Sequence, residues 1–244
     1  MSTDQQIETE IQAKGLTAPR VTPASIEAII ATGGTVTLTA TQADEINRLI
    51  ADDSMTDQFW VQQSADTQTV VASAGADTIE VSANQADSLM GAAGDDVYYI
   101  TTTGGGFTAN LLDDSISTND RIVVKATGTT DLTGLNGGQS LKAAGIDKVI
   151  ADGQTKVVLS AIQANGMTLE VTDSINGGFS IVGSTGAYGA GAQNLTGSAG
   201  ADTIEGGAGA DTINGGAGND IIVINTQGDE TGDYLTGGLG NDIL

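Results

Sequence analysis

Single isoleucines recur at every ninth position near the end of the chain, each set in polar, glycine-rich sequence. Ile204, Ile213 and Ile222 each follow an aspartate by two positions, and glycines precede each aspartate. One apolar residue per unit is enough for a short strand that points a single side chain into a core. Such a unit cannot bury that residue alone, so the pattern predicts units stacked as successive coils.

The sequence around the first of these isoleucines occurs twice in the chain. Ser73–Glu80 and Ser198–Glu205 are the same eight residues, 125 positions apart. The later copy continues with a period of nine as Gly206–Asn214 and Gly215–Val223. The earlier copy is followed by a looser match, Gly91–Tyr99, which has lost one glycine. The repeat is therefore tandem near the C-terminus and degenerate in the first half of the chain.

A full unit carries glycine at positions 1, 2 and 4 and aspartate at position 6. Glycine tolerates positive φ and lets the backbone approach a ligand closely, so the turn can aim carbonyl oxygens inward. Aspartate adds a carboxylate, and an irregular shell of oxygen atoms suits Ca2+ better than Mg2+. A glycine-rich linker with scattered aspartates is the alternative, but it gives no reason for isoleucine at a fixed offset. The repeat therefore predicts calcium-binding turns between short strands.

These units resemble the RTX (repeats-in-toxin) nonapeptide of calcium-binding parallel β-rolls, over residues 197–223 and again over 237–244. The resemblance implies two nonapeptides per coil, with each ion between turns on the same side, two repeats apart. It would place Asp202 and Asp220 on one side of the roll and Asp211 on the other. The metal-site residues expected from the array are Asp202, Asp211, Asp220, Asp242, Gly200, Gly206, Gly207, Gly209, Gly215, Gly216, Gly218 and Asn219.

The earlier copy predicts coils but leaves its calcium sites open. Alanine and serine replace the paired glycines before Asp77, and Asp77 and Asp96 are 19 positions apart, one more than the ideal. The unit between them has Asp87 at its sixth position and no glycine. A coil without full calcium loading and a real site at Asp77 and Asp96 are both consistent with this pattern.

Residues 1–34 are predicted to form two short helices. Ser2 or Thr3 can cap the first, and Gly15 can end it. Thr22 can cap the second, whose apolar stripe includes Ile29 and Ile30. Helices of about ten residues are marginal alone, so the segment is expected to dock on its own domain or to anchor the chain to a partner.

Residues 12–23 and the isoleucine-rich segment after them resemble the start of a family of small tailed-phage proteins of unassigned role. The resemblance covers only this segment and then stops. It implies that the gene belongs to a phage or prophage.

The segments 35–100 and 101–196 are predicted to be β-rich, before a calcium β-roll at 197–244. A second motif recurs in them, at 38–43, 81–86 and 159–164, and each copy predicts a strand end followed by a helical turn capped by serine or threonine. Residues 101–196 are expected to form solenoid coils of varying length, and an inserted β-sandwich is the competing interpretation. The fold class is therefore a mainly β, parallel β-solenoid with a short α-helical N-terminal segment.

Composition narrows the possible functions. The 244 residues include 31 acidic and 8 basic ones, for a net charge of −23, and no basic residue follows Lys156. Such a chain is not expected to bind nucleic acid or anionic lipid unaided. The absence of histidine and cysteine removes zinc-protease, Ser-His-Asp and thiol chemistry, and no apolar run is long enough to span a membrane.

The sequence favours a non-enzymatic, calcium-binding structural or display protein on an extracellular assembly, either a phage particle or a bacterial surface layer or adhesin. The expected partners are Ca2+ and either other copies of the chain or a scaffold reached through the N-terminal helices. The alternative is an N-terminal fragment of a type I secreted RTX enzyme or toxin, because the sequence stops inside a repeat. A soluble calcium buffer is a third interpretation, which the capped helical start does not favour.

Overall fold

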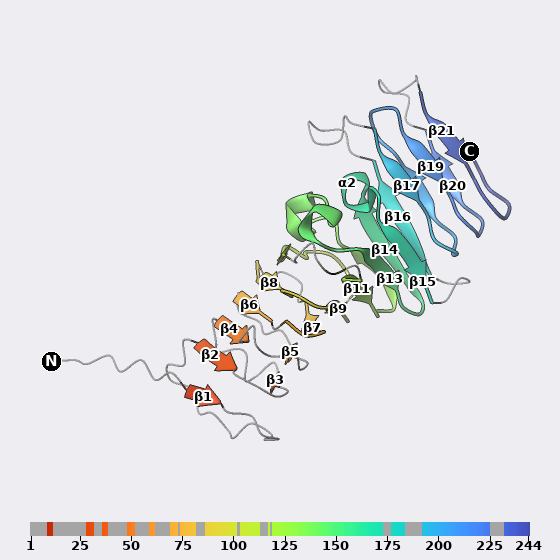
Figure 1. Ribbon diagram of the computed structural model, residues 1–244. Helices are drawn as coiled ribbons and strands as arrows, with labels where there is room; N and C mark the ends of the chain where they lie inside the picture. Colours follow the sequence, from red (N-terminus) through yellow and green to blue (C-terminus); the bar gives the residue numbers. More distant parts are fainter. Residues whose placement is uncertain are drawn as a thin grey trace.

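The coils stack along one axis, and their strands lie side by side in parallel sheets (Figure 1). The computed structural model describes residues 9–11, 28–31, 36–38, 48–51, 59–61, 69–72, 74–81, 86–101, 103–112, 117, 119–172, 177–183, 192–224 and 232–244. All of the strand pairs among these residues are parallel. The prediction of a mainly β, parallel solenoid is therefore confirmed.

Two sheets form the first part of the stack, and from β2 to β11 consecutive strands of the chain alternate between them. The first sheet contains β1 (Thr9–Ile11), β2 (Ala28–Ala31), β4 (Arg48–Ala51), β6 (Thr69–Val71), β8 (Ser88–Met90) and β10 (Asn110–Leu112). The second sheet contains β3 (Val36–Leu38), β5 (Phe59–Val61), β7 (Thr78–Glu80), β9 (Val97–Ile100), β11 (Arg121–Val124), β13 (Lys148–Ala151) and β15 (Thr168–Val171).

Two other sheets form the C-terminal part of the stack. The third sheet contains β12 (Gly128–Asp131), β14 (Thr155–Ser160), β16 (Gly178–Val182), β18 (Thr203–Glu205) and β20 (Ile221–Val223). The fourth contains β17 (Asn194–Thr196), β19 (Thr212–Asn214) and β21 (Tyr234–Thr236).

The coils between β10 and β16, called the middle coils from here on, have a third side built from helical turns. These turns are η1 (Leu135–Gly138), η2 (Lys142–Ala144) and α2 (Ala161–Ala164). Asn136 of η1 donates its backbone N–H to the carbonyl of Ala109 beside β10, at 3.0 Å. Gly166, after α2, donates to the carbonyl of Asn194 in β17, also at 3.0 Å. The side that begins as the first sheet thus continues through η1 and α2 into the fourth sheet.

The strands of residues 101–196 pair in parallel with those before and after them. β10 and β11 pair with strands of the earlier coils, and β16 and β17 pair with strands of the C-terminal coils. These residues therefore form further coils of the solenoid, and not the β-sandwich that the sequence left open. The four segment boundaries themselves stay predictions.

The core consists of inward-facing side chains stacked in columns from coil to coil. Ile181, Ile204 and Ile222 occupy matching positions in the third sheet, and all three are buried. Leu195 and Ile213 do the same in the fourth sheet. The prediction that the isoleucine of each unit points into a core is confirmed.

The prediction of two N-terminal helices is wrong where the structure describes this segment. Thr9–Ile11 and Ala28–Ala31 are parallel strands, β1 and β2, although both ranges lie within the predicted helices. Periodicity alone does not separate a short apolar run in a strand from one in a helix, and a neighbouring coil supplies a parallel partner for each. The other residues of the segment 1–34 lie outside the described residues.

The helical turn predicted after β14 is confirmed. Ser160 is its N-cap, and Gln163 at the third position completes a capping box with it. The corresponding turns at 39–43 and 82–85 lie outside the described residues. In the described part of the chain, no helix is long and apolar enough to cross a membrane.

Candidate calcium-binding turns

Three turns near the C-terminus share one backbone shape. In the turn before β20, Gly216 and Gly218 lie in the left-handed region, at φ of 101° and 124°. Only glycine adopts these angles without strain. A Cβ at Gly216 would also run into the carbonyl of Ser198 in the preceding coil. Positions 2 and 4 of the other two turns have the same conformation: Gly207, Gly209, Gly238 and Gly240.

The aspartates at position 6 form ladders across the coils. Asp220 accepts a hydrogen bond from the backbone N–H of Asp202 at 2.9 Å, and Asp242 accepts one from Asp220 at 3.0 Å. On the other side, Asp233 accepts one from Asp211 at 2.8 Å. Donor and acceptor are 18 or 22 positions apart, so each bond joins neighbouring coils. Asp202 and Asp220 therefore lie on one side and Asp211 on the other, as the resemblance implies.

Asp220 is the carboxylate best placed to bind a cation. Its side chain is fully buried, and within the described residues its Oδ2 has no hydrogen-bond partner. Burial raises the pKa of Asp220, the N–H of Asp202 opposes that rise, and the negative charge of Asp242 adds to it. A buried carboxylate with an unsatisfied oxygen is costly, and a bound cation would offset that cost.

The donor set on this side is a mixture of side-chain and backbone oxygens. Within the described ranges, no three acidic, histidine or cysteine side chains gather at one point. A cation would therefore be held by Asp220 and Asp242 together with backbone carbonyls of the turns, a mixture that Ca2+ accepts. Asn219 lies beside them, and its Oδ1 accepts the backbone N–H of Asn241 at 2.9 Å, which ties the two turns together. These residues fit Ca2+, whose charge would neutralise carboxylates of adjacent coils.

The opposite side carries a second candidate site. Asp211 is buried, and its Oδ1 accepts the backbone N–H of Gln193 at 2.7 Å. Gly206, Gly207, Asp211 and Asp233 line a small hollow between the coils. The sequence reading missed Asp233, although the nine-residue frame of 237–244, extended one unit backwards, puts Asp233 at position 6 and Leu235 at position 8.

Asp202 differs from the other predicted ligands, because the chain itself satisfies its carboxylate. Ser198 donates its backbone N–H to Asp202 Oδ2 at 2.6 Å, and the Ser198 hydroxyl lies 3.0 and 3.1 Å from the two carboxylate oxygens. Phe179 donates its N–H to Oδ1 at 2.6 Å. Burial, opposed by these hydrogen bonds, raises the pKa of Asp202 to about 6. Gly200 is not in the left-handed region, so this turn lacks the shape of its neighbours.

The earlier copy keeps part of the turn geometry. Asp77 donates its backbone N–H to Asp96 at 2.8 Å, so these two aspartates form a ladder like that of the C-terminal roll. Ala92 and Gly94 both have positive φ, 70° and 124°, which reproduces the glycine turn with one alanine. The next residue, Asp95, accepts hydrogen bonds from side chains of the following coil. Both predicted aspartates are buried.

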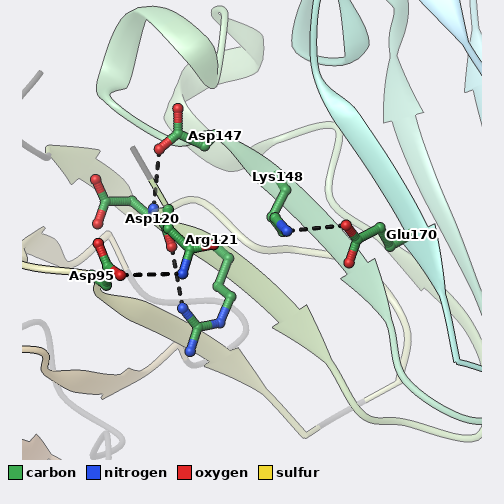
Figure 2. Close-up of polar contacts among 7 residues, drawn as sticks. Asp95, Asp120, Arg121, Asp147, Lys148 and Glu170 are labelled. Carbon is green, nitrogen blue, oxygen red and sulfur yellow. Dashed lines mark hydrogen bonds and ion pairs between the residues drawn. The ribbon is translucent and has the colours of Figure 1, made fainter. Parts of the chain in front are cut away.

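Two further rungs, Asp120 and Asp147, extend this ladder into the middle coils, and the sequence reading missed them. Asp96 donates its backbone N–H to Asp120 at 2.8 Å. Asp120 in turn donates its backbone N–H to Asp147 at 3.1 Å, as Figure 2 shows. The signal was an aspartate two positions before the inward-facing residue of a strand, Ile122 or Val149, without the full set of glycines. The aspartate ladder is thus a property of the coil, and the glycine turn is an addition to it.

Comparison with protein families agrees with this geometry. The model of the RTX calcium-binding nonapeptide repeat family matches four copies, over residues 64–98, 188–222 and 227–244. Neither the curated proteins nor the solved structures contain a match to this chain. The family match includes Asp233, the rung that the sequence reading missed. The chain is therefore a parallel β-solenoid that carries RTX calcium-binding nonapeptide repeats.

Proposed function

We propose that the chain is a non-enzymatic rod, stiffened by calcium and displayed on an extracellular assembly, either a phage particle or a bacterial surface layer or adhesin. The observation that carries this proposal is the extended stack of parallel coils, with the first and last strands at opposite ends (Figure 1). Each coil adds about 4.8 Å to such a stack. RTX repeat proteins are typically secreted, and extracellular calcium is in the range that such modules bind.

The acidic side chains support a structural role. The sequence has no histidine or cysteine, and the buried aspartates of the ladders act as acceptors for backbone N–H groups. Each ladder aspartate thus has a part in joining coils. Calcium at the glycine turns would add an electrostatic link to the same junctions. Attachment through the N-terminal segment stays a prediction, although the helices on which it was based are replaced by strands at Thr9–Ile11 and Ala28–Ala31.

The location can be tested by immunogold electron microscopy of the producing culture, with an antibody against the full chain. We expect label on phage particles or on the cell envelope, and the pattern of label separates the two. Label found only on soluble protein in the medium would contradict a display role. Cells that lack the gene serve as the control for antibody specificity.

The rod itself can be tested by small-angle X-ray scattering of the full chain. In millimolar calcium we expect a maximum dimension that matches a fully stacked solenoid. Chelation is expected to change that dimension, because the glycine turns then carry uncompensated carboxylates. Identical scattering with and without calcium would contradict stiffening by calcium.

A further inference from the structure

Asp202 and Asp220 are consecutive rungs of one ladder, yet their carboxylates are in opposite states. Both are buried, with 1% and 0% of their surface exposed. Both accept a backbone N–H from the preceding coil, at 2.6 and 2.9 Å. The second oxygen of Asp202 accepts from Ser198, whereas Oδ2 of Asp220 has no hydrogen-bond partner among the described residues. The turn of Asp220 therefore leaves a carboxylate oxygen available to a cation, and the turn of Asp202 does not.

Ser198 accounts for this difference. It occupies position 2 of its unit, where the neighbouring units have Gly207 and Gly216 in the left-handed region. Its hydroxyl contacts both oxygens of Asp202 and accepts the N–H of Gly200 at 3.1 Å. The hydroxyl therefore supplies one donor to the carboxylate and accepts a buried backbone N–H, and the backbone N–H of Ser198 supplies a second donor.

The coils before Ser198 are likewise joined by side-chain donors. Gln163 donates to the carbonyls of Leu132 and Leu135, both at 2.9 Å, from a fully buried position. Thr172 donates to Asp152 at 2.7 Å and accepts the N–H of Gly153 at 2.7 Å.

Side-chain hydrogen bonds also occur in the turns near β9, β11 and β12. Ser117 and Asn119 donate to the carboxylate of Asp95 at 3.0 and 3.3 Å. Within a single turn, Asp131 accepts both the N–H and the hydroxyl of Thr133, at 2.9 and 2.7 Å. Hydrogen bonds within the protein thus hold turn after turn between β9 and β18.

We infer that Ser198 replaces calcium in its turn and marks a boundary in the solenoid. The coils from β11 to β18 fold without calcium, and β18 leaves a sheet edge with which the next coil can pair. The coils of β19 and β20, which follow glycine turns, and of β21, which precedes one, require calcium and assemble on that edge. This inference rests on the calcium role in the proposed function, and it adds which turns take the ion and which do not.

The first test is hydrogen exchange of the full chain, read by mass spectrometry with and without chelator. Exchange in residues 212–236 is expected to rise about 100-fold per site when calcium at about 100 times its dissociation constant is removed. Exchange in residues 148–171 is expected to stay unchanged. Loss of protection in both segments would overturn the boundary but leave the calcium-stiffened rod intact. No change in either segment would overturn both.

The second test counts calcium ions bound per folded chain by equilibrium dialysis. Ser198→Gly removes the hydroxyl donor to Asp202 and permits at position 2 the left-handed conformation of Gly207 and Gly216, so we expect one more calcium ion than in the wild type. Ser198→Ala also removes the hydroxyl but does not restore the left-handed position, so it is the matched control and should gain none. An unchanged count in Ser198→Gly, or an equal gain in both variants, would overturn the role of Ser198.

Discussion

The middle coils and the C-terminal coils have the same architecture but are held together differently. Both have parallel strands, columns of buried apolar residues and aspartate ladders. In the middle coils, side-chain donors such as Gln163 and Thr172 join one turn to the next. In the C-terminal coils, turns with two left-handed glycines precede the aspartates Asp211, Asp220 and Asp242. This difference is the basis for the inference that the turn sequence, and not the coil itself, decides whether calcium is needed.

The distribution of basic residues also differs between the middle coils and the C-terminal coils. Lys148 pairs with Glu170 at 3.0 Å (Figure 2), and Lys125 pairs with Asp152 at 3.5 Å, so the middle coils contain cations of their own. No lysine or arginine follows Lys156 in the sequence. The C-terminal coils therefore have only backbone groups, polar side chains or a bound cation to offset their carboxylates.

The largest expected effect comes from removing one charge in each region. Asp220→Asn and Asp120→Asn make the same change at two fully buried positions, each of which accepts a backbone N–H from the preceding coil. We expect Asp220→Asn to abolish the calcium-dependent protection of β20 and β21, because asparagine keeps the hydrogen bond but loses the charge. Asp120→Asn should leave calcium binding unchanged.

Isothermal titration calorimetry with calcium measures how many ions each of the two variants binds. Asp220→Asn should bind fewer calcium ions, and hydrogen exchange should confirm that the middle coils remain folded. Equal loss of calcium in the two variants would show that the middle ladder also holds the ion.

The pH dependence of the calcium-free protein should differ between the regions. Because burial raises the pKa of Asp202 from 3.8 to about 6, the folded state binds its proton more tightly than the unfolded state. This contribution is fully present below pH 3.8 and is lost as the pH rises through 6, with a loss of about 3 kcal/mol for one site. The raised pKa of Asp220 acts in the same direction.

Differential scanning calorimetry between pH 4 and 7 in calcium-free buffer measures this dependence. We expect the transition of the coils that contain Asp202 and β18 to move to lower temperature as the pH rises. Asp202→Asn should flatten the profile, since asparagine does not titrate in this range. A transition that moves to higher temperature with rising pH would contradict the assignment.

Gln163 provides the corresponding test in the middle coils. Its Nε2 donates to two backbone carbonyls, so Gln163→Ala leaves Leu132 and Leu135 without these bonds. We expect the free energy of unfolding to fall by about 2 to 3 kcal/mol, equally with and without calcium. Gln163→Glu keeps the oxygen that accepts the N–H of Ser160 but sets a buried carboxylate oxygen against the two carbonyls, so it should cost at least as much. Urea denaturation at two calcium concentrations measures both variants, and a calcium-dependent loss would contradict a calcium-free block.

The sequence predicted the fold where each unit carries its own signal. Isoleucine two positions after aspartate identified the inward residue of β18, β19 and β20, and Ser160 with Gln163 identified the helical turn after β14. These features depend on local spacing and on capping chemistry, which a sequence shows directly. The parallel stacking followed from them, because no unit buries its apolar residue alone.

The sequence did not predict features that depend on the neighbouring coil. The strands β1 and β2 are short apolar runs that a parallel partner stabilises, and that partner is 20 positions away along the chain in register (Thr9 to Ile29). The contacts of Ser198 were also missed, because the tandem nonapeptides that follow it made the turn look like a calcium site. Its contacts with Asp202 and the N–H from Phe179 become visible only in the folded coil.

The smallest expected effect concerns the ion pairs of the middle coils, and it decides what holds these coils together. In a double-mutant cycle of Lys148→Ala and Glu170→Ala, we expect a coupling of about 0.5 kcal/mol, because nearly half of the Glu170 side chain is exposed, 46%. The longer Lys125 and Asp152 pair should couple more weakly. Both couplings should shrink as salt rises from 0.05 to about 0.5 M. Urea denaturation of the single and double variants gives these values, and a salt-resistant coupling above about 1.5 kcal/mol would mean that ion pairs, and not the buried hydrogen bonds of Gln163, replace calcium in the middle coils.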